Sequence, residues 1–253
     1  MDMDLLRIAV ALCLLGGVGA AEPARPRIIF TGNLNISSAE LLNAIDDPFE
    51  ANGTLQQELF ERDLLLLVAH YWDLGYARVR VGEPKISATQ IVIPIVENEV
   101  FTIGSVVVTG DPTPRMRARH RDAVSTRPSM LFSRTRISND RERISRYYEE
   151  RGYYSIDVRP MTKTDIPKRT IALDFQIELG KVTYVEGVNL DCPKVPDAAK
   201  AITVFAGDRY DVRTFEASKA AIMALGSLGK DDVMMWAKHG ATDERVILGF
   251  ECR

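Results

Sequence analysis

The sequence predicts an α+β protein of three tandem βααββ repeats, each a three-stranded mixed sheet covered by two helices, in an elongated chain. Two glycine series predict these repeats. Glycines that close a short β-branched strand stand at Gly32, Gly110 and Gly187, and glycines that end a helix stand at Gly75, Gly152 and Gly229. Both series share a period of about 77 residues, which is typical of a repeat architecture. The helical spacing of the apolar residues before the second series is the third observation.

Residues 1–20 have the features of a secretory signal peptide. An apolar run over residues 8–18 is too short to span a bilayer, and small residues follow it. Cleavage after Ala20 would leave Val18 and Ala20 at the small-residue positions. The sequence therefore predicts an exported and cleaved protein, and the alternative is an uncleaved membrane anchor.

The first repeat, residues 24–100, shows every expected element. Its first strand is the segment RIIFTGN, and Ser37 with Glu40 three residues later forms a capping-box pattern at the first helix. The second helix is predicted from apolar residues at helical spacing, namely Phe60, Leu64, Leu67, Val68 and Tyr71. Alternation and β-branched content predict the later strands at residues 77–81 and 90–97.

The later repeats, residues 101–180 and 181–253, follow the same order. In the second repeat the helix positions return as Ile137, Ile144 and Tyr148. The later strands are predicted at residues 155–159, 170–178, 232–236 and 244–251. A glycine directly after a helical run is the expected left-handed helix end, because a residue without Cβ avoids the steric cost of that conformation.

Three short motifs give the chain a family resemblance. They are the strand end at residues 30–33, the YxxxGY helix ends at residues 71–76 and 148–153, and the strand ends at Glu97 and Glu178. On these motifs, residues 24–180 resemble the POTRA domains of outer-membrane barrel assembly and translocation proteins. From residue 181 onward the resemblance is weaker, because Lys230 follows Gly229 and Leu225 stands at the tyrosine position.

Composition and motifs argue against catalysis and nucleic-acid binding. The formal net charge is −3, so no global attraction to nucleic acid is implied. The histidines His70, His120 and His239 show no metal-ligand spacing, and no nucleophile or phosphate-binding motif is present. We therefore expect no enzymatic activity, no cofactor and no metal.

The second strand of each repeat is the candidate binding element. In the βααββ order this strand lies at an edge of the sheet, where unpaired backbone groups can bind an extended segment, and the resemblance implies the same mode. The candidate edge residues are Arg78, Val79, Arg80, Ser155, Ile156 and Asp157. The first repeat is the favoured docking site. The alternative is that Arg78, Arg80 and Arg159 block edge pairing.

A basic cluster in the second repeat is a second candidate surface. Its arginines are Arg115, Arg117, Arg119 and Arg121. Such a cluster can bind acidic partner segments or lipid headgroups. The alternative is an ordinary solvated helix.

Two cysteines, Cys192 and Cys252, remain once the signal peptide is removed. In the family's strand order the first and third strands are parallel neighbours, so the resemblance places both cysteines at one end of the third sheet. Export permits a disulfide between them. Two free buried thiols are the alternative.

These features predict a periplasmic polypeptide-binding scaffold or chaperone-like component of outer-membrane protein assembly or protein translocation. The expected partners are unfolded or extended polypeptides and outer-membrane assembly or translocation proteins, with no nucleic acid. Peripheral association with the outer membrane would occur through a barrel partner. The alternatives are an envelope scaffold of the division-protein type and the N-terminal part of a longer barrel assembly protein.

Overall fold

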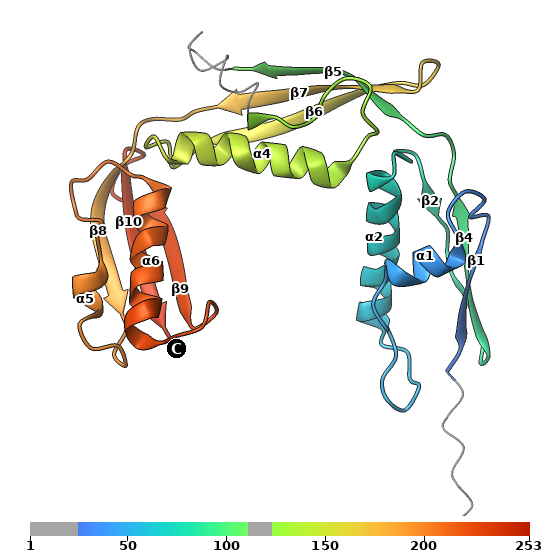
Figure 1. Ribbon diagram of the computed structural model, residues 1–253, viewed down its shortest axis with the longest axis horizontal. Helices are drawn as coiled ribbons and strands as arrows, with labels where there is room; N and C mark the ends of the chain where they lie inside the picture. The colour runs from blue at the N-terminus through green and yellow to red at the C-terminus, as the bar shows by residue number, and fades with distance from the viewer. Residues whose placement is uncertain (1–24, 111–122) are drawn as a thin grey trace, which may run out of the picture. The chain divides into compact units, whose positions relative to one another are not determined.

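The computed structural model describes residues 25–110 and 123–253 (Figure 1). The expected signal peptide and the cluster of Arg115, Arg117, Arg119 and Arg121 lie outside the described residues. The chain forms two compact units, one of the described residues up to Leu66 with Val81–Ile95, the other of Leu67–Arg80 with Val96–Arg253. Within the described residues, no helix is both long and apolar enough to cross a membrane.

The sheet of the first repeat has an interrupted second strand. Its order is β1 (Arg27–Thr31), β4 (Gln90–Val96) and β2 (Arg80–Val81), and β3 (Lys85–Ile86) also pairs with β4. β1 runs parallel to β4, whereas β3 runs antiparallel to it. The second strand is therefore shorter than the sequence predicts, and a further short strand follows it.

The other two sheets each have three continuous strands (Figure 1). The second sheet has the order β5 (Thr102–Thr109), β7 (Thr170–Glu178) and β6 (Asp157–Asp165). The third has the order β8 (Tyr184–Asp191), β10 (Arg245–Cys252) and β9 (Val233–His239). In both, the central strand runs parallel to the first strand and antiparallel to the second. The predicted α+β class with mixed sheets is confirmed.

The described helices are α1 (Ser38–Asn43) and α2 (Gln57–Asp73) in the first repeat, α4 (Arg134–Glu149) in the second, and α5 (Ala198–Ala201) and α6 (Val212–Gly226) in the third. Of these, α2 and α4 lie where the apolar periodicity predicts a helix. The Ser37 hydroxyl accepts a hydrogen bond from the backbone N–H of Glu40 at 3.2 Å, so it caps α1 as expected.

Each second helix buries one face. Among the predicted core positions, Leu64 and Val68 are half-buried and the others are buried, namely Phe60, Leu67, Tyr71, Ile137, Ile144 and Tyr148. The side chains of α4 pack with Leu173 and Phe175 of β7. In the third repeat, Phe215 of α6 meets Phe250 of β10 edge to face, with ring centroids 5.1 Å apart. Burial of each such side chain contributes about 2 kcal/mol, so these faces supply most of the stability of the helices.

Four of the six marker glycines have a positive φ, which was predicted only for the helix-ending ones. Gly75 and Gly152 follow their helices with φ of 94° and 87°. Gly32 and Gly110 close their strands with φ of 81° and 82°. A Cβ at Gly32 or Gly110 would lie 2.1 or 2.2 Å from a carbonyl oxygen of the neighbouring strand. Only glycine fits these two positions, both sterically and by backbone conformation.

The roles predicted for Gly187 and Gly229 are wrong. Gly187 lies inside β8, and the left-handed residue after α6 is Ser227, with φ of 50°, rather than Gly229. The residue that follows the first strand, as Gly32 and Gly110 do, is Cys192 in the third repeat. The glycine spacing fails here because the long β6–β7 hairpin delays β8, which begins later after β5 than the glycine period predicts.

The helix-ending glycines also join successive repeats inside the larger unit. The Gly75 carbonyl accepts a hydrogen bond from the N–H of Phe101 at 2.8 Å, and the Gly152 carbonyl accepts one from Thr183 at 2.7 Å. Phe101 and Thr183 directly precede β5 and β8. The residue before the first strand of each of these sheets is therefore hydrogen-bonded to the backbone at the end of the preceding repeat's second helix.

Candidate functional site

The candidate site is the outer edge of the second strand of each sheet. Among the described residues, β2, β6 and β9 each occupy an end of their sheet's strand order. An edge strand binds an extended segment through the N–H and C=O groups that its own sheet leaves unpaired. The capacity of each edge therefore depends on its length and on which backbone groups are already bonded.

In the first repeat, most of the expected edge residues precede the strand. The N–H of Val79 donates to the Tyr76 carbonyl at 3.1 Å, and the Val79 side chain is buried. The Arg78 carbonyl accepts a hydrogen bond from the side chain of Asn98 at 2.7 Å. Only Arg80 belongs to β2. The strand predicted from residue 77 is wrong for its first three residues, because their backbone groups close the turn after Tyr76.

A proline in the central strand accounts for the short edge. Pro94 lies in β4, and its carbonyl accepts a hydrogen bond from the N–H of Gly82 at 2.8 Å. The nitrogen and carbonyl of one strand residue point to the same side, so the Pro94 nitrogen also faces Gly82 and has no hydrogen to donate. The ladder is therefore interrupted between β2 and β3.

In the second repeat, the edge strand is longer than predicted. Ser155 and Ile156 precede β6, and Asp157 is its first residue. The strand has nine residues and pairs with β7 without a register shift. Its length is enough for several backbone hydrogen bonds to an added strand.

The backbone directions in β6 follow from one hydrogen bond of β7. The Thr102 N–H donates to the Arg169 carbonyl at 3.0 Å, so residue 169 faces β5 and Thr170 faces β6. Thr170 pairs with Asp165, which therefore faces β7. By alternation the residues that face outward are Val158, Pro160, Thr162 and Thr164. Pro160 lacks an N–H and fits an edge strand only in this direction.

The charge of Arg159 on β6 is satisfied locally. Its guanidinium donates to Asp157 at 2.6 Å and to Glu178 at 2.9 Å. Hydrogen bonding to Asp157 raises the pKa of Arg159, with a further contribution from the charge of Glu178. An incoming strand therefore meets a paired arginine at this position.

In the third repeat, a tyrosine from the second repeat occupies part of the edge. The Gly240 N–H donates to the Arg245 carbonyl at 2.9 Å, so by alternation Ala237 of β9 faces outward. The Tyr154 hydroxyl donates to the Ala237 carbonyl at 3.0 Å. Burial raises the pKa of Tyr154, which keeps this donor protonated. Sequence reasoning missed Tyr154, although it is the second tyrosine of a Gly-Tyr-Tyr segment.

A buried polar side chain recurs in the middle of each second helix, and sequence reasoning missed this series as well. Its members are Asp63, Asp140 and Ser218, which share the period of the glycines. Each accepts a backbone N–H from the segment before the helix, at 3.3 Å from Asp46, 2.7 Å from Ser125 and 3.0 Å from Thr203. The common period was the signal that could have found them.

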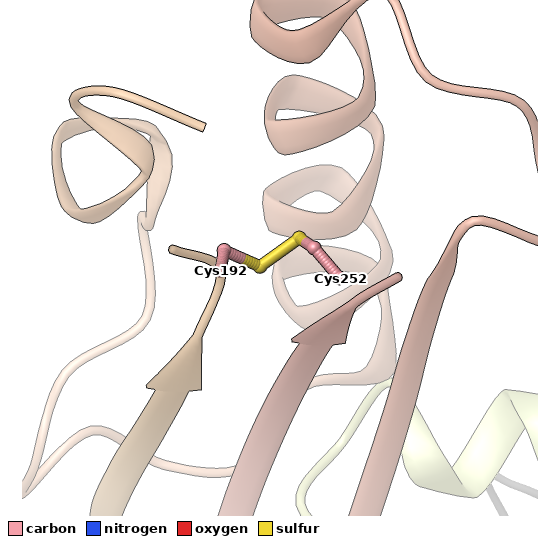
Figure 2. The surroundings of a disulfide bond; sticks show 2 residues. All are labelled: Cys192 and Cys252. Atoms are coloured by element: carbon pink, nitrogen blue, oxygen red, sulfur yellow. A yellow bond between two sulfur atoms is a disulfide. The ribbon is translucent and has the colours of Figure 1, made fainter. Parts of the chain in front are cut away.

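A disulfide joins Cys192 and Cys252 in the third repeat. Figure 2 shows Cys192 just beyond the end of β8 and Cys252 at the end of the adjacent parallel strand β10. Their Cα atoms are 4.6 Å apart. The pairing that the resemblance implied is therefore present, at the position where the first two repeats have glycine.

The part of the chain that the structure describes holds no group of three or more His, Cys, Asp and Glu residues arranged to bind a metal ion.

Comparison with known sequences gives two matches. A family model named POTRA, described as a surface antigen variable number repeat, matches residues 26–100 and 101–180. The outer membrane protein assembly factor BamA of Buchnera aphidicola is 25% identical over 144 residues, which cover 54% of this chain and 23% of that protein. The chain thus spans about a quarter of the length of this relative.

Solved structures show the same fold. POTRA3-5 of BamA from Haemophilus influenzae has a TM-score of 0.76 at 18% identity, covering 91% of this chain and 96% of that chain. BamA from Haemophilus ducreyi lacking POTRA domains 1-3 has a TM-score of 0.50 at 18% identity, covering 60% of this chain and 29% of that chain.

Proposed function

We propose, on the premise that this chain belongs to the POTRA family, that it binds extended polypeptides as a non-enzymatic scaffold in outer-membrane protein assembly or protein translocation. The sequence relative named above is an outer membrane protein assembly factor, which supports this assignment. The partners we propose are unfolded polypeptides and outer-membrane assembly or translocation proteins. The location we propose is the periplasm, with peripheral association to the outer membrane through a barrel partner.

The observation that supports binding is the outer edge of β6, which pairs with no other strand among residues 25–110 and 123–253. Its outward-facing donors are the N–H groups of Val158, Thr162 and Thr164, and its strand is longer than β9 and β2. An added strand would pair with these groups and with the carbonyls beside them. Backbone pairing leaves the choice of sequence loose, which suits a scaffold for many clients.

The second repeat therefore replaces the first as the favoured docking site. β2 offers only Arg80 and Val81, and the Ala237 carbonyl of β9 is already bonded to Tyr154. Both β2 and β9 are therefore weaker candidates for binding an extended polypeptide than β6.

A proline substitution at an outward-facing residue tests this proposal. Thr162→Pro removes one free donor and no bond to β7, so the sheet should remain folded while capture of a client weakens by about tenfold. Thr162→Val is the matched control, because it keeps the N–H and should bind as the parent does. The assay is crosslinking of the purified chain to an unfolded outer-membrane barrel polypeptide, with circular dichroism as the check of folding.

Equal capture by folded Thr162→Pro and Thr162→Val would count against binding at β6. A proline at Val79 cannot serve this purpose, because the Val79 N–H is bonded to Tyr76 within the turn.

A further inference from the structure

The outer edge of β5, on the far side of the second sheet from β6, has a covered half and a free half. At its start, the Ile103 N–H donates to Met130 at 2.7 Å and the Ile103 carbonyl accepts from Ser129 at 2.8 Å. A register shift follows between Ile103 and Ser105. Beyond the shift, no other strand or loop of residues 25–110 and 123–253 pairs with the outer side of residues 105–109.

The free half lacks the usual defences against edge-to-edge pairing. β5 carries no charged residue and no proline, whereas β6 has both, including Pro160, Arg159 and Lys163. The Val107 side chain is 49% exposed. An uncharged, β-branched edge of this kind is a template for pairing with another strand.

The sequence of this free half is symmetric about Val107. On either side of it, Val106 matches Val108, Ser105 resembles Thr109, and Gly104 matches Gly110. In an isologous contact between two copies, residue i meets residue j and residue j meets residue i. An antiparallel pair centred on Val107 therefore places valine beside valine and one hydroxyl beside another, and such cross-strand pairs are favourable.

The backbone directions permit this pairing. The Thr102 N–H faces β7, and after the register shift Ser105 and Val107 align with Ala172 and Asp174 of β7. Because Arg169 faces β5, Ile171 and Leu173 do so too, and they bond to Ser105 and Val107 in the parallel ladder. Val106 and Val108 are thus left with outward-facing N–H and C=O groups.

We propose that β5 pairs with β5 of a second copy of this chain, antiparallel and centred on Val107. Val106 of each copy exchanges backbone hydrogen bonds with Val108 of the other, and the two Val107 side chains meet at the two-fold axis. The contact closes at a dimer, because both copies use the same patch. It is a weak, transient association, since one strand pair buries less than about 1,200 Å². This inference does not depend on polypeptide binding at β6.

Sedimentation of the purified chain across a wide concentration range tests the proposal. The parent should show a reversible monomer–dimer equilibrium. Val107→Lys should weaken it by about tenfold, because like charges lie directly opposite each other at the axis. Met161→Lys is the matched control, since Met161 is 50% exposed and flanks Asp174 from the β6 side, as Val107 does from the β5 side. It should dimerise as the parent does.

Variants of opposite charge at Val107 test whether this residue lies at the two-fold axis of the proposed dimer. Val107→Glu alone should also weaken the dimer, and an equal mixture of the Val107→Lys and Val107→Glu chains should recover it as a mixed pair. Thermal unfolding of each variant is needed, because the neighbouring Asp174 favours lysine over glutamate within one chain. If the glutamate variant is unfolded, the comparison of Val107→Lys with Met161→Lys decides alone.

Three results would overturn the proposal. The first is a parent that is monomeric at every concentration, even if its β5 edge captures an added peptide. The second is an equal loss in Val107→Lys and Met161→Lys. The third is assembly that continues beyond a dimer.

Discussion

The buried aspartates at equivalent positions of the first two repeats, Asp63 and Asp140, differ in how many hydrogen bonds they accept. Asp140 accepts hydrogen bonds from the backbone N–H and the hydroxyl of both Ser125 and Thr126, and it also contacts Arg143. Asp63 accepts one bond, from the N–H of Asp46, and its Oδ2 has no hydrogen-bond partner in the described structure. Both side chains are almost fully buried.

The pKa values of the two carboxyl groups are therefore shifted in opposite directions from the ordinary value of an aspartate. Burial alone would raise the pKa of Asp140, but the hydrogen bonds from Thr126 and Ser125 outweigh it and lower that pKa. Burial raises the pKa of Asp63, and the charges of Asp46 and Asp47 raise it further. The difference shows that the segment before the helix decides whether a buried carboxylate stabilises its repeat.

The third repeat has a neutral serine, Ser218, at the equivalent position, so it buries no carboxylate there. Ser218 accepts from the N–H of Thr203 and donates to the Thr214 carbonyl at 2.9 Å. This repeat also carries the Cys192–Cys252 disulfide. The three repeats thus differ at this position. Asp140 has several hydrogen-bond donors, Asp63 has one oxygen without a donor, and Ser218 carries no charge.

The largest expected effect is loss of the disulfide. Replacing Cys192 and Cys252 by alanine should destabilise the third repeat by roughly 4 kcal/mol, because the bond closes a loop of 60 residues in the unfolded chain. Urea unfolding with and without reductant measures the loss, and peptide mapping without reductant should recover the linked pair. Unchanged stability of the double variant would show that the disulfide does not stabilise the third repeat.

The next effect is at Asp140. Asp140→Ser should destabilise the protein by about 3 kcal/mol, because the N–H groups of Ser125 and Thr126 lose a buried acceptor. Hydrogen exchange should become faster at these two amides. Retained protection at both amides would mean that another acceptor replaces the carboxylate.

The same substitution at Asp63 should change the free energy of unfolding in the opposite direction. Asp63→Ser should stabilise the protein by about 1 kcal/mol at neutral pH, since it removes a buried carboxylate with an unbonded oxygen. Urea unfolding followed by hydrogen exchange within α2 measures the change. A loss of stability would show that the bond from Asp46 is worth more than the burial of the charge.

The smallest effect is the pH dependence that separates the two aspartates. The stabilisation from Asp140 is present above the unfolded pKa near 3.8 and is lost as the pH falls through its lower folded pKa. Asp63 favours the folded state below 3.8, and this contribution is lost as the pH rises through its higher folded pKa. Unfolding curves of both serine variants against the parent, across acid pH, should therefore diverge in opposite directions.

Local pattern predicted the helices and most of the strands, because their apolar faces are read directly from the sequence. Phe60, Tyr71 and Tyr148 are buried as the helical spacing indicates. The pairing of Cys192 with Cys252 was inferred differently, from the strand order that the POTRA resemblance implies.

Other features depended on contacts that periodicity does not contain. Pro94 was visible within the QIVIPIV segment, but its effect on the second strand required the register with Gly82. Gly187 was assigned by spacing alone, whereas strand pairing places Cys192 at that position. The hydrogen bond from Tyr154 to β9 joins residues 83 positions apart, so the Gly-Tyr-Tyr segment alone does not indicate its acceptor.

The carbonyls of Gly75 and Gly152 have a consequence for how such chains are inherited. Each lies well inside one repeat, yet its donor, Phe101 or Thr183, belongs to the next. A duplication or exchange that copied one repeat from end to end would separate acceptor from donor at both cuts. Because both hydrogen bonds join backbone atoms, any residue except proline at position 101 or 183 could supply the donor, so the join places little demand on the sequence of the neighbouring repeat.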